Sequence, residues 1–465
     1  MDDRSPLPSH ESERRARWLL IATFLHGLIY FCMLPPWMGE DEPWHFENLS
    51  HVASGHWTKS DRVYEMEDQR ELPLTQIQSL RRFDGLTEDE AASTQLEILA
   101  SMRENEFWRR VDWAGRGDAV RNFDEVAWGF STSQQPPLYY FVAAPLAAVT
   151  KSASVDVRLY CVRALSLLLY VATVWLVLRI ARDVFGEHDE ASCLLAAFLA
   201  AWFPMHARMA AVVNNDVLAR FWVTLTLYFA VRVVSRRAGR REAIGLGLVC
   251  LAALATKTTA MSALAVAMLA VLLVPREPLV KNRKWWLLPI ALVVGGLAVV
   301  FWQSMHNPAV PYSLQELSKR FDYALSGAGF REVRDSFLGS FNWESRPLPG
   351  WVRTTFGLGA LAALVGAVLA WWREREPLAR RLVLLMLGAF AVQFALILLR
   401  GVGKGRYLMP AIAAIAILVV VGLVRVLPEK RRPVAAGLLA VTWVAFDAAF
   451  LWNGLAFHQY VAWGN

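Results

Sequence analysis

Repeated apolar runs of about 20 residues constrain this chain more than any other feature of its sequence. Helices of that length cross the roughly 30 Å hydrocarbon core of a bilayer and satisfy their own backbone hydrogen bonds there. Hydrophobic residues make up 55% of the chain and charged residues 19%, against roughly 45–50% and 25% in soluble domains. The sequence therefore predicts an all-α polytopic membrane protein with about 11 transmembrane helices.

Basic residues lie mainly in the short segments between the apolar runs. Arg14, Arg15 and Arg17 precede the first run, so the positive-inside rule places the N-terminus in the cytoplasm. The same rule accounts for the formal net charge of +7, and a nucleic-acid partner is therefore not expected. We expect a multi-pass protein of the plasma (inner) membrane. Its first helix is expected to be retained, because no small-residue cleavage site follows it.

The alternation of apolar and polar stretches predicts a bundle with two large outer loops. Capping-box patterns at Thr87 to Glu90 and at Ser313 to Glu316 predict a surface helix in each loop, the second one amphipathic. The expected segments are a cytoplasmic N-terminus at 1–17, the first membrane helix at 18–34, an outer loop with surface helices at 35–135, a membrane bundle with a juxtamembrane helix at 136–302, a second outer loop at 303–350, a membrane bundle at 351–451 and an outer tail at 452–465.

The segment Gly39-Glu-Asp-Glu-Pro-Trp-His45 follows the outer end of the first predicted helix. Carboxylates at the mouth of a membrane helix are costly to place and often functional. A partly desolvated carboxylate can act as a general base, so Asp41 and Glu42 are the catalytic candidates. Together with His45 they could also hold a divalent metal ion, and a solvated acidic loop is the alternative. His45 is also a candidate substrate-binding residue, and it could instead orient a carboxylate or fill the interface. Pro43 favours a loop over a helix here.

Two further motifs carry polar groups at the same outer side. Gln135 precedes a proline pair, after which Tyr139 and Tyr140 could contact a substrate or simply anchor at the membrane interface. Asn215 and Asp216 lie in a short outer loop, where either could bind a ligand or cap the next helix. We keep all five as candidate substrate-binding residues.

Cationic candidates follow along the chain. Arg220 lies one turn inside an apolar run, where a charge needs a partner or a polar cavity. Lys257 lies between two apolar runs and Arg163 interrupts another, and each of the two could snorkel or bind an anion. The Gly-rich loop ending in Tyr407 contains Lys404 and Arg406, and such a loop can form a phosphate cradle or a simple turn.

These polar groups, except Arg163, fall on the outer side of the predicted topology. Acidic groups come from the first outer loop, and cations come from the turns near Lys257 and Arg406. A carboxylate opposed by cations suits a reaction on a phosphate-linked substrate, because the base deprotonates an acceptor and the cations stabilise the departing phosphate. No nucleotide-binding fingerprint occurs in the chain, and a membrane-anchored donor would not require one.

The order of these motifs resembles the GT-C superfamily of polytopic glycosyltransferases. The resemblance is closest to the branch of protein O-mannosyltransferases, the lipid A aminoarabinose transferase and related bacterial membrane proteins. The matching pieces are Glu40-Asp41-Glu42 with His45, Gln135-Pro-Pro-Leu-Tyr-Tyr140, Asn215-Asp216, Thr256-Lys257 and Gly405-Arg-Tyr-Leu-Met-Pro410.

The resemblance implies a GT-C-like fold, a polyprenyl-phosphate-sugar donor and an inverting transfer on the outer face of the membrane. At the matching positions Asp41 or Glu42 would be the base, and Lys257 and Arg406 would contact the donor phosphate. Those families often carry His where this chain has Gln135, which leaves the role of that imidazole open. We expect no large soluble C-terminal domain of the kind that some members of those families carry. The acceptor, whether glycan, lipid or protein, is not specified.

Two other function classes compete with this interpretation. A transporter or flippase for an anionic lipid-linked substrate would place charges in mid-span and show inverted repeats with broken helices. A non-catalytic scaffold of the cell envelope would not need the acidic segment. No cofactor is expected beyond a possible divalent metal ion at Asp41, Glu42 and His45.

Overall fold

The computed structural model describes residues 10–39, 41–55, 72–73, 94, 97–98, 100–102, 104–105, 126–127, 135–235, 239–274, 322–323, 326–341, 346–400 and 405–463. Several expectations lie wholly or mostly outside these residues. They are the surface helix at 87–102, the membrane span at 285–302, the amphipathic helix that starts at Ser313, and the side chain of Lys404.

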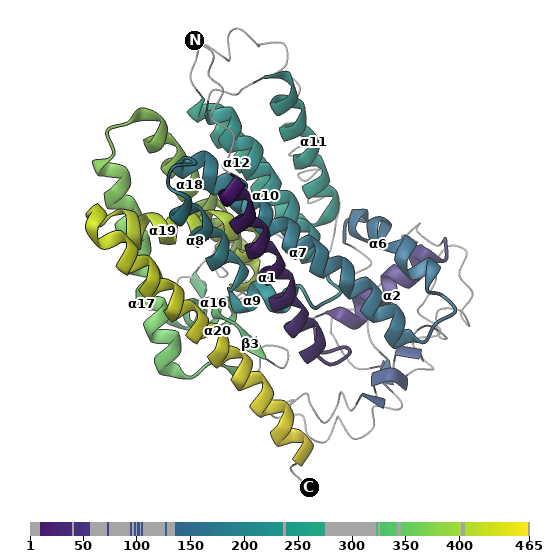
Figure 1. The fold of residues 1–465 in the computed structure, drawn as a ribbon. Helices are drawn as coiled ribbons and strands as arrows, with labels where there is room; N and C mark the ends of the chain where they lie inside the picture. The colour runs from purple at the N-terminus through teal and green to yellow at the C-terminus, as the bar shows by residue number, and fades with distance from the viewer. Residues whose placement is uncertain are drawn as a thin grey trace.

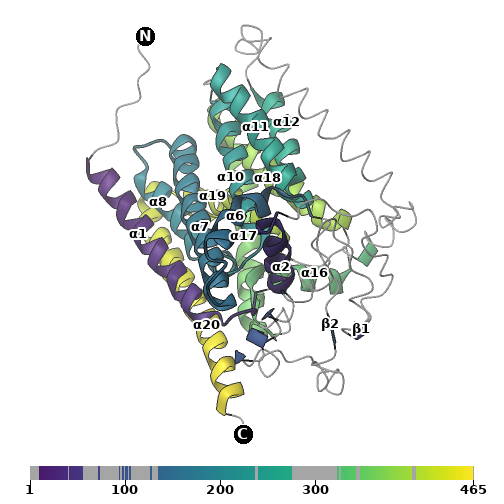
Figure 2. The same ribbon diagram turned by 90° about the vertical axis from the view of Figure 1, so that its right-hand side faces the viewer.

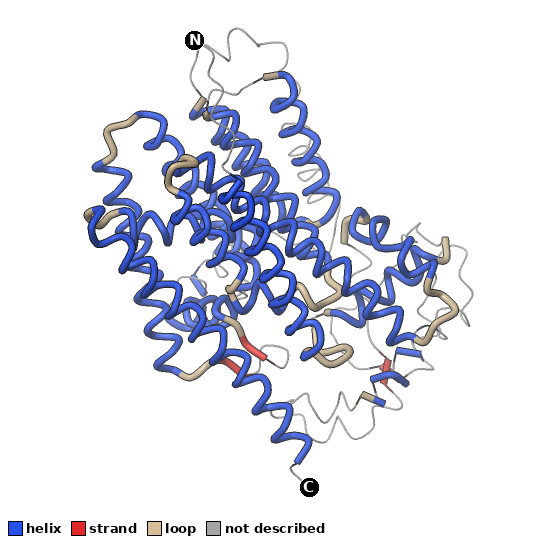
Figure 3. The backbone as a smooth tube through the Cα atoms, viewed as in Figure 1, coloured by secondary structure: helices blue, strands red, loops and turns tan. Residues whose placement is uncertain are grey.

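The described part of the chain is a bundle of apolar helices, as the apolar runs predict (Figures 1 and 3). Among these residues, seven helical segments are long and apolar enough to cross a membrane. They are α1 (His10–Met33), α7 (Val155–Phe185), α10 (Asn215–Val234), α17 (Gly350–Arg373), α18 (Pro377–Arg400), the η3–α19–η4 segment (Gly405–Ala411, Ile412–Val420, Val421–Arg425) and the η5–α20 segment (Glu429–Arg431, Arg432–Trp463).

Shorter elements complete the bundle and its connections. They are α2 (Glu42–Ala53), α6 (Leu138–Val149), α8 (Glu190–Ala201), α9 (Pro204–Met209), α11 (Arg240–Thr256), η2 (Thr258–Met261), α12 (Ser262–Leu273) and α16 (Gly327–Leu338). The prediction of an all-α membrane protein is therefore confirmed, whereas the count of about 11 membrane helices is not confirmed by the seven described.

Two short antiparallel strand pairs accompany the helices. Strand β1 (Leu72–Pro73) pairs with β2 (Val126–Ala127), and β3 (Ser340–Phe341) pairs with β4 (Arg346–Pro347). Each strand has only two residues, so these pairs connect loop segments and form no sheet layer (Figure 3).

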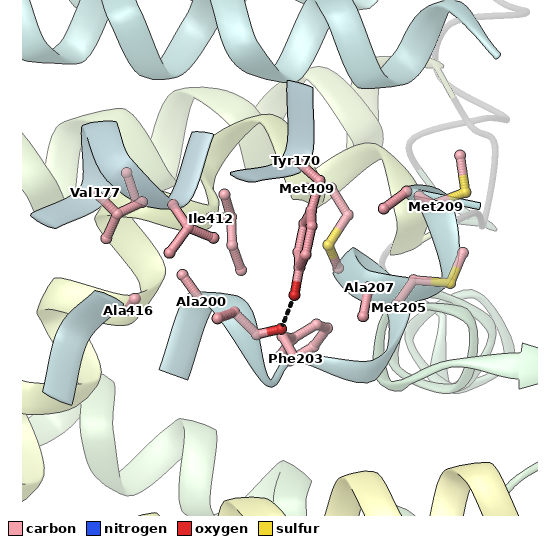
Figure 4. Packing of buried hydrophobic residues seen from close by; sticks show 14 of the residues in the cluster. Tyr170, Val177, Ala200, Phe203, Met205, Ala207, Met209, Met409, Ile412 and Ala416 are labelled. Atoms are coloured by element: carbon pink, nitrogen blue, oxygen red, sulfur yellow. Dashed lines mark hydrogen bonds between the residues drawn. The ribbon is translucent and has the colours of Figure 1, made fainter. Parts of the chain in front are cut away.

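The core lies where α7 packs against α1, α8 and α10. Small residues on α8, including Ala196 and Ala200, are fully enclosed and allow close helix approach. Figure 4 shows Tyr170 among Phe203, Met205, Met409 and other buried side chains; its hydroxyl donates to the carbonyl of Ala201 at 2.5 Å. This hydrogen bond satisfies the one polar group that the ring brings into an apolar core.

A pair of glycines sets the crossing of α17 and η4. A Cβ atom at Gly366 would lie 2.1 Å from the carbonyl oxygen of Gly422, and one at Gly422 would lie 1.9 Å from that of Ala363. Both distances are far below van der Waals contact. The two backbones therefore touch directly, as small residues allow in membrane helices.

The two ends of the chain meet through a buried polar cluster on α1, α7 and α20. His26 Nε2 lies 2.8 Å from Asp447 Oδ2, Tyr30 donates to Asp447 Oδ1 at 2.7 Å, and His26 Nδ1 lies 3.3 Å from the hydroxyl oxygen of Tyr170. The courses of α1 and α20 overlap in the view of Figure 2, and His26 and Tyr30 of α1 both bond to Asp447 of α20. Since polar groups are costly in an apolar interior, their pairing with each other fixes α20 against α1.

The acidic segment departs from the expectation of a loop. Helix α2 begins at Glu42, and Pro43 occupies its first turn. Proline is tolerated there because the amide groups of the first helical turn have no partner within the helix. By contrast, α6 is the expected short helix after the proline pair, with 12 residues.

Candidate active site

Two ion pairs lie at the loop end of the bundle, where α2, α10, the α11–η2 junction and η3 meet. Arg406 Nη2 lies 2.7 Å from Asp41 Oδ2, and Lys257 Nζ lies 2.8 Å from Asp216 Oδ1. The four residues come from widely separated motifs, and Asp41 and Arg406 are 365 positions apart. The fold thus gathers two carboxylates and two cations from sequence motifs that were expected to share one side of the membrane.

Asp41 occupies the residue before α2 in a left-handed backbone conformation, with φ 61° and ψ 9°. Aspartate tolerates this region better than most residues with a side chain. Its carbonyl accepts the hydrogen bond from the amide of His45 at 3.0 Å, which closes the first turn of the helix. The Asp41 side chain stays 30% exposed, whereas that of its partner Arg406 is 2% exposed. Of the pair, the carboxylate is the group that a substrate could reach.

Glu42 is next in sequence but points into the protein. Arg163 donates to both of its carboxylate oxygens, at 2.8 Å from Nε and 2.6 Å from Nη2. The amides of Val213 and Gly39 also donate to these oxygens, at 2.9 and 3.3 Å. Neither side chain of the ion pair is exposed. Glu42 therefore joins the α1–α2 connection to α7 and to the segment before α10.

Arg163 of α7 makes further hydrogen bonds to the same region. It donates to the backbone carbonyls of Leu34 and Pro35, at 2.7 and 2.9 Å, in addition to Glu42. One guanidinium group thus binds both the Glu42 carboxylate and the backbone of the segment that follows α1. The result is a fixed starting point for α2 and for Asp41.

His45 is buried on α2 beside the two tyrosines of α6. Its Nδ1 lies 2.9 Å from the Tyr140 hydroxyl, and the two rings stack with centroids 6.0 Å apart. Burial, followed by the positive charge of Lys257, lowers the pKa of His45 to about 3. The imidazole is therefore neutral at physiological pH. Tyr139 is also enclosed, with its ring edge-on to that of Tyr140 at 5.5 Å.

Lys257 lies between α11 and η2 and has an extended backbone conformation. Its side chain points toward α10 and η3. Its Nζ lies 5.6 Å from the ring centroid of Tyr407, as well as next to Asp216. Gln393 of α18 donates to the backbone carbonyl of Tyr407 at 2.6 Å and so fixes the backbone of η3 at this residue. The amide of Gly405 donates to Ser336 Oγ at 2.5 Å, which ties η3 to α16.

Asn215 joins the remaining motifs at the start of α10. Its Nδ2 donates to the Thr256 carbonyl at 3.3 Å and to Gln135 Oε1 at 3.5 Å. Asn214, rather than Asn215 or Asp216, caps α10 by accepting the Asp216 amide at 2.9 Å. Asn215 Oδ1 and Asp216 Oδ2 are buried and have no hydrogen-bond partner among the residues that the structure describes. Two acceptor oxygens in the site thus have unused hydrogen-bonding capacity.

Arg220 lies one turn deeper along α10. It is 1% exposed and donates from Nη1 to the His206 carbonyl at 3.4 Å. Its charge acts on Asp216 without contacting it directly. Arg220 therefore acts on the site through its charge, from one turn deeper in α10. The short segment predicted as an outer loop at 205–215 overlaps the helix α9, all six residues of which are buried.

A comparison with protein families identifies a membrane protein family. A family model described as "Predicted membrane protein (DUF2142)" matches residues 24–415, which is most of the chain. The chain belongs to the DUF2142 family. No curated protein matches it.

Among solved structures, the DUF2142 chain is similar to ArnT from Cupriavidus metallidurans. The structure bound to undecaprenyl phosphate is 15% identical, with 96% of this chain and 72% of that chain covered and a TM-score of 0.47. The apo structure is also 15% identical, with 97% and 73% covered and a TM-score of 0.46.

The metal interpretation of the acidic segment finds no geometric support in the described part of this DUF2142 chain. No group of three or more His, Cys, Asp or Glu side chains there could hold a metal ion. Asp41, Glu42 and His45 point to three different partners, which are Arg406, Arg163 and Tyr140. The three side chains therefore do not share one ligand-binding point.

The sequence left the role of Arg163 open between snorkelling and anion binding. The structure places it in the ion pair with Glu42, which makes it a positioning residue for α2. An arginine inside an apolar run needs a partner, and here that partner is Glu42 at the start of α2. Ser336 and Gln393, which hold η3, carried no sequence signal, since both look like ordinary polar residues.

Proposed function

We propose that this chain is a glycosyltransferase that moves a hexosyl or pentosyl group from a polyprenyl-phosphate-linked donor to an envelope lipid, glycan or protein. The observation that carries the proposal is the 2.7 Å ion pair between Asp41 and Arg406, next to the 2.8 Å pair between Asp216 and Lys257. Two cations and one accessible carboxylate in a single site are the groups that such a transfer requires.

The proposal includes a GT-C-like layout in the inner membrane, with the site on the outer face and the N-terminus in the cytoplasm. The order of the matching motifs supports the layout. The orientation rests on Arg14, Arg15 and Arg17, which lie at the opposite end of α1 from Asp41. No cofactor takes part in the scheme.

The donor phosphate binds between Lys257 and Arg406. Both side chains are almost enclosed, at 7% and 2% exposure, so their charges act in a low-dielectric setting. Arginine can bind phosphate oxygens in a bidentate way, and lysine acts as a point charge. As the bond between the anomeric carbon and the phosphate oxygen breaks, both cations stabilise the electron pair that leaves with the polyprenyl phosphate.

Asp41 is the general base in this mechanism. When Arg406 turns to the phosphate, the Asp41 carboxylate accepts a proton from the acceptor hydroxyl. The acceptor oxygen then forms its bond to the anomeric carbon on the face opposite the phosphate, and the configuration inverts. Glu42 is unsuited to this role, because both of its oxygens are engaged by Arg163 and by backbone amides.

The donor sugar lies beside α10. Asn215 Oδ1 and Asp216 Oδ2 can accept hydrogen bonds from sugar hydroxyls, since neither oxygen has a partner among the described residues. Tyr407 presents its ring at the same point, and aromatic rings suit the apolar face of a sugar. Gln135 accepts from Asn215, and Tyr140 contacts His45. Both residues therefore lie at the edge of the proposed sugar site.

A transporter for an anionic lipid-linked substrate is the second candidate, and one observation favours it. Buried ionisable groups continue inward from the site through Arg220 and His206 to His26 and Asp447. Intramembrane charges of this kind mark substrate or proton pathways in transporters. Donor breakdown with release of polyprenyl phosphate separates the two functions, because a transporter leaves the donor intact.

The test uses proteoliposomes with undecaprenyl-phosphate donors that carry a radiolabelled hexose or pentose, together with an envelope lipid extract as acceptor. The measured quantity is the rate of undecaprenyl phosphate release. Asp41→Asn keeps the left-handed conformation accessible and removes the base, so we expect a loss of about 100-fold or more. Asp335→Asn is the matched control, because Asp335 forms an ion pair with Arg353 on α16 and α17 outside the site.

Wild-type release by Asp41→Asn would show that Asp41 is not the base. If no donor is consumed by the wild-type protein while labelled donor crosses the bilayer, the transporter is correct instead.

A further inference from the structure

A second cationic site lies at the turn between α17 and α18. A cavity of about 330 Å³ opens there, lined by Trp371, Arg375, Pro377, Arg380, Arg381 and Leu384. Helix α17 leads away from α16, and α18 leads back to η3, so the turn lies one helix length from the Asp41–Arg406 pair. Helices of 24 residues span about 36 Å, which makes the two sites independent.

The three arginines of this cavity have no carboxylate partner among the described residues. The acidic side chains of the turn are used elsewhere: Glu374 accepts the amide of Glu376 at 3.0 Å, and Glu376 accepts the amide of Ala379 at 2.5 Å. The guanidinium of Arg380 instead lies 5.0 Å from the ring centroid of Trp371. Three guanidinium groups without a carboxylate partner among the described residues can donate together to one anion.

The cavity also has a buried hydrogen-bond donor. The indole Nε1 of Trp371 is enclosed and has no acceptor within the part of the chain that the structure describes. A buried N–H group without a partner costs free energy, and an acceptor in the cavity would satisfy it. An anion with several oxygens can meet the indole and the arginines together.

The surroundings of the cavity identify the source of that anion. Helix α17 exposes large apolar side chains along its length, namely Leu358, Leu361, Val365, Val368, Leu369 and Trp372. In a membrane protein such a face lies against lipid tails, and tryptophan is typical of the interface with the headgroups. Arginines at this depth meet phosphate groups of lipids before they meet solutes.

We propose that this cavity binds the phosphate headgroup of an anionic membrane lipid. The phosphate lies between Arg375, Arg380 and Arg381 and accepts from the indole of Trp371, while the acyl chains follow the apolar face of α17. This site is separate from the transfer site, so the proposal stands or falls independently of the proposed function.

The test compares purified protein in nanodiscs of mixed phosphatidylglycerol and phosphatidylcholine, with retained lipids counted by native mass spectrometry. The triple variant R375Q/R380Q/R381Q is expected to retain phosphatidylglycerol at least about tenfold less. The control variant R14Q/K430Q/R431Q removes three exposed basic charges outside the cavity and is expected to match the wild type. W371F keeps the ring, removes the N–H donor, and is expected to give a smaller loss of the same kind.

Equal loss in the triple and control variants would overturn the proposal, since the effect would then be general surface charge. Equal retention of the two lipids by the wild type would overturn it as well. Inorganic phosphate at millimolar concentration separates the sources: we expect it to leave the lipid bound, and complete displacement would identify a soluble anion as the occupant. If the triple variant does not fold, R380Q with W371F gives the same comparison.

Discussion

Glu42 and Arg163 form a two-point ion pair, 2.6 and 2.8 Å long, in which neither side chain is exposed. Replacing Glu42 with Gln leaves the guanidinium charge buried without its counter-charge, which costs about 3–5 kcal/mol. We expect Glu42→Gln to lower the melting temperature in detergent and the yield of folded protein. Transfer per folded molecule should fall far less than in Asp41→Asn. Unchanged melting with lost transfer would instead indicate a catalytic role for Glu42.

Lys257 and Arg406 should determine the affinity for polyprenyl phosphate. A hydrogen bond to a charged group is worth about 1.5–3 kcal/mol, so Arg406→Gln is expected to raise the Kd for undecaprenyl phosphate about 10- to 100-fold. Lys257→Gln should act in the same direction, and Lys257→Arg should restore most of the affinity. Thermophoresis with labelled protein measures the Kd, with exposed Lys430→Gln as the control. An unaltered Kd in both Gln variants would contradict phosphate binding at this site.

His45 should make the protein sensitive to acid. Its pKa is near 6.5 when unfolded and about 3 when folded, so the unfolded chain binds the extra proton between these values. The stability that comes from burying the neutral ring is therefore complete above about pH 6.5 and is lost as the pH falls toward 3, by about 1.4 kcal/mol per pH unit.

His45→Gln keeps a polar partner for Tyr140 and removes the titration. We expect it to flatten the fall of the melting temperature between pH 6.5 and 4.5, whereas His188→Gln, on the exposed turn after α7, should not. An identical pH slope in His45→Gln and the wild type would mean that this ring is not the acid-sensitive group.

The crossing of α17 and η4 should tolerate no side chain larger than hydrogen. A Cβ at Gly366 meets the Gly422 backbone at 2.1 Å, so Gly366→Ala must shift one of two helices and should cost about 1–3 kcal/mol. Gly359 lies on the same helix with nothing within 4 Å of its Cβ position. Gly359→Ala should therefore be neutral or slightly stabilising. Thermal unfolding of the two variants in the same detergent gives the comparison, and equal melting would refute the tight crossing.

Much of the gathering of side chains could be predicted from the sequence, because topology fixes which loops share a side of the membrane. Asp41 with Arg406, Asp216 with Lys257, and Gln135 with Asn215 all come from motifs assigned to one side. The division of labour between Asp41 and Glu42 could not be predicted. It depends on the left-handed backbone of Asp41 before α2 and on the ion pair that Arg163 of α7 forms with Glu42. Neither feature can be recognised from the local sequence.

Contacts between polar residues of distant helices inside the bundle could not be predicted from the sequence either. His26 and Asp447 are 421 positions apart, and each looks like an isolated polar residue in an apolar run. Helix packing brings them to one point, and sequence spacing carries no information on which faces of two distant helices meet. The expectation of a loop at Pro43 was wrong for a more local reason, since the first turn of a helix accepts proline.

The pairing of Asp41 with Arg406 and of Asp216 with Lys257 has a consequence for selectivity. Two positive and two negative side chains cancel, so an empty site offers little attraction to chloride or phosphate from solution. An incoming phosphate must compete with a carboxylate for its cation. A ligand held in the bilayer by its own hydrocarbon chain arrives at a high effective concentration and can win that competition, whereas a dilute soluble anion cannot. In the proposed mechanism, anchorage of the donor in the membrane therefore favours its binding at this site over that of soluble anions.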